Sequence, residues 1–255
     1  MALQGDLAQM LCGLPIKIDS CKIAITQPTI QDICGYGEDN FFMAIKLLTE
    51  TEEITKPVKQ GNSQLEMLSD FQLLMVILNQ DNALRESIQQ FFNLIFPNYR
   101  CDFDNGSINF FIEEETKIVG QINPMNFSDL QRVLKELFLP SDLKDQENNY
   151  NPANKLAEEI AEKLKKGNAI RNQLKAEKGD GEEKSLLGTY LSILSIGLSM
   201  DIRILVQYTP FQLYDAFKRY TAKITDDFYQ KITTTPLMDA SKMKQPDSWM
   251  GTIYK

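Results

Sequence analysis

The sequence predicts a mainly α-helical protein that contains a small antiparallel β-hairpin or sheet. Apolar residues recur three and four residues apart over most of the 255 residues, which is the spacing of amphipathic helices. One short region alternates apolar and polar residues around a turn signal. We expect an α+β N-terminal domain (1–140), a charged helical connector (141–184) and an all-α C-terminal module (185–255).

The first elements are short. Alternation between Ile16 and Ile25 indicates one or two strands or an extended arm. Thr29, with Asp32 three residues later, resembles a capping box and predicts a helix start. Gly35-Tyr36-Gly37 ends that helix, and Phe41 to Leu48 form the broad apolar face of the next one.

Residues 50–64 are polar and contain Pro57 and Gly61, so we predict a loop there. Apolar residues at helical spacing from Leu65 to Leu78 predict a helix. Asp81 is the expected N-cap of a further helix whose inward stripe runs to Ile95.

The pattern then changes to that of strands. Residues 99–103 and 108–112 alternate on either side of Asp104-Asn105-Gly106, a combination that indicates a β-hairpin. Residues 117–122 are a candidate third strand. Asn126 opens a helix with an apolar face that ends before Pro140.

The connector 141–184 is set apart by its composition. Residues 153–178 are rich in Ala, Glu, Lys and Leu, and Gly179-Asp180-Gly181 closes this stretch. A charged, exposed helix is the natural interpretation, with a short coiled coil as the alternative.

The C-terminal module contains several predicted helices. Residues 186–198 are strongly apolar and include small residues that would allow a partner helix to approach closely. Met200-Asp201 starts a short helix, and Thr209-Pro210 combines an N-cap with proline at the first helical position. Asp226 or Asp227 is expected to start another short helix. The small residues are Gly188, Ser192, Ser195 and Gly197.

The charge is uneven. The net charge is −8, with 18 basic and 29 acidic side chains in residues 1–183, against 9 basic and 6 acidic in residues 184–255. Nucleic acid and anionic membranes bind preferentially to basic surfaces, so neither is the expected partner. An acidic body with a mildly basic C-terminal part suits contact with another protein or with itself, or two solvated surfaces without a partner.

The composition excludes several kinds of active site. The chain has no histidine, which excludes Ser-His-Asp and Cys-His catalysis and mixed Cys/His zinc sites. Its four cysteines form no C-x-x-C pair and are expected to be buried thiols in a reducing compartment. There is no phosphate-binding glycine loop, and the clusters Glu50–Glu53 and Glu113–Glu115 lack EF-hand spacing. We expect a non-enzyme without catalytic, cofactor or metal sites; a carboxylate-based metal enzyme is the least favoured hypothesis.

Residues 199–220 resemble a helix–turn–helix, so a DNA-binding regulator is the alternative function. The first turn of the second helix offers Thr209, Pro210 and Phe211 where base-reading polar side chains would be needed. Lys218 and Arg219 lie near the far end of that helix. These features favour packing over base recognition.

Five residues are candidates for contact with a partner. Gln212, Asp215, Lys218 and Arg219 are expected to share one solvent-facing arc of a helix. Trp249 is the only tryptophan and lies in a polar tail. It either folds back onto the C-terminal helices or anchors a partner.

Both ends of the chain resemble a known group of proteins. Leu191 to Ile202, Tyr208 to Tyr220 and Asp247 to Met250 are similar to a pattern in proteins of the tail-gene region of phages and prophages of Gram-positive bacteria. Ile23 to Ile33 and Tyr36 to Phe42 resemble the opening of the same proteins. The resemblance implies a tail assembly chaperone-like protein or a minor tail component.

A bacteriophage chaperone of this kind would hold the aggregation-prone tape measure protein and bring tail tube subunits to it. Its place would be the host cell cytoplasm during virion assembly, and a minor tail component would be a viral structural protein of the virion. The start of the chain, which lacks the basic region of a signal peptide, agrees with a cytoplasmic protein. The resemblance brings no catalytic residue with it.

Overall fold

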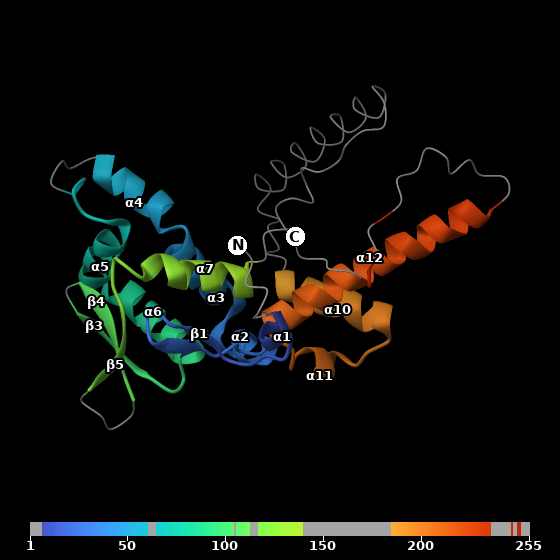
Figure 1. Cartoon of the computed structure of the whole chain (residues 1–255), viewed down its shortest axis with the longest axis horizontal. Coiled ribbons are helices and arrows are strands. Elements are labelled where there is room, and N and C mark those ends of the chain that lie inside the picture. Colours follow the sequence, from blue (N-terminus) through green and yellow to red (C-terminus); the bar gives the residue numbers. More distant parts are fainter. Residues whose placement is uncertain are drawn as a thin grey trace.

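The computed structural model describes residues 7–60, 65–104, 106–112, 117–139, 185–235, 246 and 249–250. It confirms the predicted class, with mainly helices, two small antiparallel sheets and a helical C-terminal region (Figure 1). None of the described helices is long and apolar enough to cross a membrane. The predicted connector (141–184) and the Glu113–Glu115 cluster lie outside the described residues.

The N-terminal alternation is a hairpin. A short helix that the sequence did not predict, α1 (Leu7–Leu11), precedes β1 (Ile16–Ile18) and β2 (Ile23–Ile25). The two strands pair antiparallel, with Ile16 opposite Ile25, and their isoleucines are buried. Of the two alternatives, the prediction of strands is therefore confirmed and that of an extended arm is not.

The predicted capping box starts α2 (Ile30–Tyr36). Thr29 Oγ1 accepts from the amide of Asp32 at 3.2 Å, and the Asp32 carboxylate accepts from the amide of Thr29 at 2.9 Å. Gly37 separates α2 from α3 (Glu38–Thr49) at φ 105°, a conformation that favours glycine.

The predicted loop over 50–64 is wrong, because residues Thr51–Gln60 form helix α4 with Pro57 inside it. The buried face of α4 carries Thr51 and Thr55, so it shows no apolar stripe in the sequence. Each threonine hydroxyl donates to a carbonyl of the preceding turn, as Thr51 does to Leu47 at 2.9 Å. A hydroxyl satisfied in this way can be buried at little cost.

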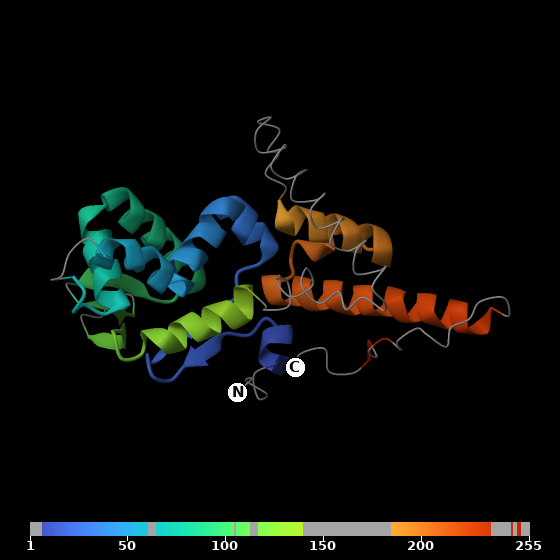
Figure 2. The same ribbon diagram turned by 90° about the horizontal axis from the view of Figure 1, so that it is seen from above.

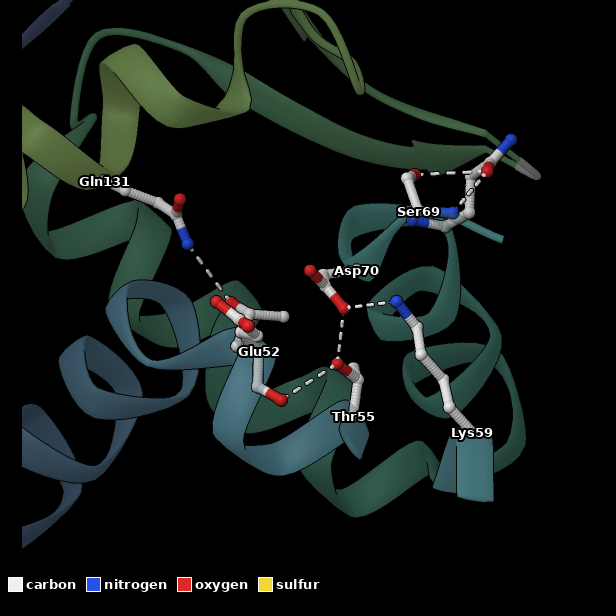
Figure 3. A network of polar contacts seen from close by, with 8 residues as sticks. Glu52, Thr55, Lys59, Ser69, Asp70 and Gln131 are labelled. Atoms are coloured by element: carbon white, nitrogen blue, oxygen red, sulfur yellow. Dashed lines mark hydrogen bonds and ion pairs between the residues drawn. The ribbon is translucent and has the colours of Figure 1, made fainter. Parts of the chain in front are cut away.

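Helix α4 is held against α5 (Asp70–Gln80) by the carboxylate of Asp70 (Figure 3). Its Oδ1 accepts from Lys59 Nζ at 2.7 Å and from Thr55 Oγ1 at 2.6 Å. The hydrogen bond from Lys59, and then that from Thr55, lower the pKa of Asp70. Helix α5 begins at Asp70 and not at the predicted Leu65, because the Ser69 capping box sets its start.

The remaining elements of the N-terminal part agree with prediction. Helix α6 (Asn82–Ile95) is capped by Asp81, and β3 (Arg100–Asp104) forms a hairpin with β4 (Ser107–Phe111). The candidate third strand is β5 (Ile118–Ile122), which pairs with β4. Helix α7 (Phe127–Phe138) follows. Phenylalanines fill much of the space between these helices and the sheet: Phe41, Phe91, Phe92, Phe96, Phe110 and Phe138.

The two sheets meet at Gly120, where no side chain fits. A Cβ there would lie 2.5 Å from Ile23 Cγ2 and 2.6 Å from the carbonyl oxygen of Cys21. The side-chain amide of Asn126 joins the same region by donating to the carbonyls of Ser20 and Gln121 at 3.0 and 2.9 Å.

The C-terminal part consists of α10 (Leu186–Leu198), α11 (Ile202–Leu205) and α12 (Pro210–Thr234). The expected helix start at Asp226 or Asp227 is wrong, because both residues lie inside α12, which is 25 residues long. Asp226 accepts from Gln230, and Asp227 from Lys223, so both carboxylates bond to side chains four residues away within one helix.

The C-terminal part docks on the N-terminal part through backbone hydrogen bonds and a shared apolar core. The amides of Ile30 and Gln31, at the start of α2, donate to the carbonyls of Tyr208 and Val206 at 2.8 and 2.9 Å. Glu38 accepts from the amide of Leu187, at the start of α10, at 3.0 Å. Buried side chains of both parts belong to one continuous core.

The close approach at Gly120 predicts the effect of a single methyl group. Gly120→Ala should lower the free energy of unfolding by about 2 kcal/mol, because two of the obstructing atoms belong to the backbone and cannot rotate away. Gly35→Ala, where nothing lies within 4 Å, should instead raise it by about 0.5–1 kcal/mol, since alanine favours helix. Urea denaturation measures both; equal effects would contradict the packing described.

The Asp70 network predicts a dependence on pH. Asp70→Asn should cost roughly 1 kcal/mol at neutral pH, after allowance for partial exposure of the ion pair, and should speed amide exchange in α4. The folded-state pKa of Asp70 is lowered, so its contribution to the free energy of unfolding is complete above the unfolded-state pKa of about 3.9. That contribution is lost as the pH falls through the folded-state pKa. Glu66→Gln, at an exposed carboxylate in the preceding turn, is the control. A cost that persists unchanged at low pH would contradict this assignment.

Candidate protein-binding surface

The groups that most often carry chemistry are dispersed. Among the described residues no three His, Cys, Asp or Glu side chains gather where they could hold a metal ion. Cys21 and Cys101 are buried, and burial raises the pKa of both thiols, that of Cys101 to about 12. Cys12, in the turn after α1, and Cys34, in α2, are exposed, so the expectation of buried thiols is wrong for these two.

The structure has an open pocket that the sequence did not suggest. It encloses about 430 Å³ between β1, the turn after it and α7. The Ser20 hydroxyl donates to Asp129 Oδ2 at 2.7 Å, and Arg132 lies 3.7 Å from the same carboxylate. Lys17 and Asp19 also line it. The lining charges are mixed and largely exposed, so they select no single class of ligand.

The segment proposed as a helix–turn–helix presents little to DNA. Helix α11 has only four residues, and the first turn of α12 is inserted into the core, with Pro210, Phe211 and Leu213 buried. Thr209 caps α12 and Pro210 follows it, as predicted, and Gln212 completes a capping box that was not predicted. A base-reading helix needs this turn exposed, so the geometry favours packing.

The four candidate contact residues of α12 do not form one solvent-facing arc. Asp215 is 8% exposed and accepts from Arg219 Nε at 3.0 Å. Gln212 closes the Thr209 capping box and donates to the carbonyl of Leu11 at 2.7 Å. Lys218 and Arg219 are partly exposed. The expected arc is wrong because α12 packs on α1 and α7 as well as on α10.

Arg219 also donates from Nη1 to the carbonyl of Trp249 at 3.1 Å. The tail is therefore bonded to α12 at this point, and the Trp249 side chain is partly buried. This placement corresponds to the alternative in which the tryptophan folds back onto the C-terminal helices.

Helix α10 carries the more conspicuous surface. None of its 13 residues is charged, and it is apolar on both sides. One side, which includes Leu187, Leu191 and Leu194, is buried. The opposite side exposes Ile193 and Ile196, the latter to 79%.

Helix α11, which packs against α10, exposes Ile202 and Ile204 in the same module. We call these four isoleucines the outer helical face. Large apolar side chains exposed on one module are typical of a surface that contacts a partner. The sequence identified α10 as strongly apolar but could not indicate which of its sides the fold would cover.

Comparison of the chain with protein-family models, with curated proteins and with solved structures found no match.

The bond between Arg219 and the tail can be tested with the single tryptophan as reporter. Arg219→Met should remove the hydrogen bond to the Trp249 carbonyl, shift the tryptophan emission to the red and lower its anisotropy, because the side chain becomes more exposed. Arg203→Met, which breaks an exposed ion pair with Asp201 instead, should leave the emission unchanged. Equal spectra for Arg219→Met and the unaltered chain would contradict the placement of Trp249.

Proposed function

We propose that this protein works by binding another protein through the outer helical face, as a bacteriophage tail assembly or virion-associated protein. The observation that carries the binding role is the uncovered apolar side of α10 with Ile202 and Ile204 of α11. The assignment to phage tails is supported by the resemblance of both ends of the chain to proteins of the tail-gene region. No catalytic step is part of the proposed role.

The chemistry of the outer helical face favours a protein partner. The exposed isoleucines of α10, which has no charged residue, match the apolar core of a protein interface. Binding to anionic membrane surfaces normally requires basic residues beside the apolar ones, and α10 has none. Phosphate contacts from lysine and arginine dominate DNA affinity, which disfavours DNA as the partner of this face.

A chaperone-like role also agrees with the distribution of charge. A chaperone for the tape measure protein must cover apolar segments of a long, aggregation-prone chain while itself remaining dispersed. The outer helical face would supply the contact. The net charge of −8 would keep the complex soluble, with most of the acidic excess in residues 1–183.

Co-expression with the tape measure and tail tube proteins from the same tail-gene region tests this proposal. The tagged chain should co-purify with one of them. Ile193→Glu with Ile196→Glu should abolish capture, because binding would then bury two unpaired carboxylates in the interface. Met43→Glu, at an exposed methionine of α3, should leave capture unchanged. Circular dichroism must show that all variants fold alike.

Two results would contradict the proposal. One is a chain that captures neither tail component. The other is a salt-sensitive shift of duplex DNA that Lys218→Ala with Arg219→Ala abolishes, which would favour the DNA-binding alternative.

A further inference from the structure

The second half of α12 extends beyond the rest of the protein. Figures 1 and 2 both show α12 running past the end of α10. Gly197, near the end of α10, lies against the ring of Tyr220, so close that a Cβ would fall 2.1 Å from the ring. Residues 221–234, which we call the distal half of α12, lie beyond this contact. At 1.5 Å per residue they span about 21 Å.

The distal half continues the apolar face that the first half buries. Leu213 and Ile224 are eleven residues apart, as are Phe217 and Phe228, and eleven residues bring a helix back to the same side within about 20°. Leu213 is buried, and Phe217 packs on Tyr190 of α10 with ring centroids 4.4 Å apart. Ile224 is 48% exposed and Phe228 57% exposed. One stripe is thus covered by α10 along half its length and uncovered along the rest.

The described part of the tail lies on another side of the helix. Arg219, which holds the carbonyl of Trp249, is two residues from Phe217 and therefore about 200° around the helix from the stripe. The bond that fixes the tail thus points away from Ile224 and Phe228. This favours an occupant from outside the chain.

We propose that the distal half of α12 pairs in antiparallel orientation with the distal half of α12 in a second copy of this chain. Beyond the end of α10 the exposed stripe continues for about 21 Å, and the distal half of a second copy is a helix of that length with the same exposed stripe. In antiparallel orientation each helix occupies the place beyond the other copy's α10. The two-fold arrangement closes on itself and leaves no free stripe.

The charges beside the stripe select the antiparallel orientation. Lys223 and Asp227 lie along one edge of the stripe, joined by a 2.7 Å ion pair within the helix. With the two helices centred on Thr225, each Lys223 faces the Asp227 of the other copy, and Ile224 and Phe228 of the two copies interleave. In a parallel two-fold pair each charged edge would instead face the opposite, uncharged edge of the stripe, which carries Thr221 and Thr225, so these ion pairs between copies would be lost. The distal half has two basic and two acidic residues, so the net charge of −8 on the chain does not oppose association there.

Sedimentation of the full chain tests the proposal. The mass should be twice 29.2 kDa, and Phe228→Glu should give a monomer with an unchanged far-ultraviolet circular dichroism spectrum, since Phe228 is exposed within one copy. Met125→Glu, at a 93% exposed methionine in another region, should remain a dimer. A monomer at all accessible concentrations, or a dimer that survives Phe228→Glu, overturns the proposal.

Charge exchange tests the orientation. Lys223→Glu and Asp227→Lys should each weaken the dimer by about tenfold, equivalent to 1.4 kcal/mol. When the two variants are mixed in equal amounts they should form a heterodimer, in which an acidic edge faces a basic one. The ion pair within a single helix cannot produce this rescue, because it stays broken in both chains. Failure to reassociate overturns the antiparallel pairing.

The dimer test is independent of the proposed function. None of these variants alters the outer helical face, so loss of partner capture and loss of the dimer can be observed separately.

Discussion

The structure depends on the junction between the start of α2 and the turn that leads into α12. The first amides of a helix have no partner within it, and those of Ile30 and Gln31 find theirs in the carbonyls of Tyr208 and Val206. A buried amide left without an acceptor costs about 1–3 kcal/mol, so the two segments stabilise one another although nearly 180 residues separate them in sequence. Glu38 adds a carboxylate at the start of α10, where the helix dipole favours a negative charge.

This junction determines which surfaces remain uncovered. It seats the first turn of α12 in the core and directs the rest of the helix outward (Figure 2). It also turns one side of α10 inward, so that Ile193 and Ile196 lie on the other. The two apolar surfaces proposed to bind partners are therefore consequences of one docking arrangement.

Much of the fold could be predicted because its boundaries depend on neighbouring residues. The Thr29 capping box, the Thr209 and Asp81 caps and the β3–β4 hairpin depend on residues close to one another in sequence, and each is found where predicted. Helix α4 was missed because its buried face carries threonines, whose hydroxyls donate to backbone carbonyls three or four residues earlier. Its anchor, Asp70, lies beyond a stretch of polar residues and gave no local signal.

The surface could be predicted less well than the fold. Gln212 and Asp215 have polar side chains, yet the packing of α1 and α7 on α12 covers Asp215 and engages Gln212. Conversely, α10 has no charged residue and carries large apolar residues on opposite sides, so its sequence does not indicate which side is buried. The bonds that decide this, from Ile30 and Gln31, join backbone groups and involve no particular side chain.

Amide hydrogen exchange of Ile30 and Gln31 in the full chain tests the docking most directly. If the two segments are joined as described, both amides should exchange as slowly as those of helix α5, because both are hydrogen-bonded to carbonyls of residues that pack against the core. Rapid exchange of these two amides, while α5 stays protected, would show that the C-terminal helices do not rest on α2. It would contradict the arrangement from which both binding surfaces follow.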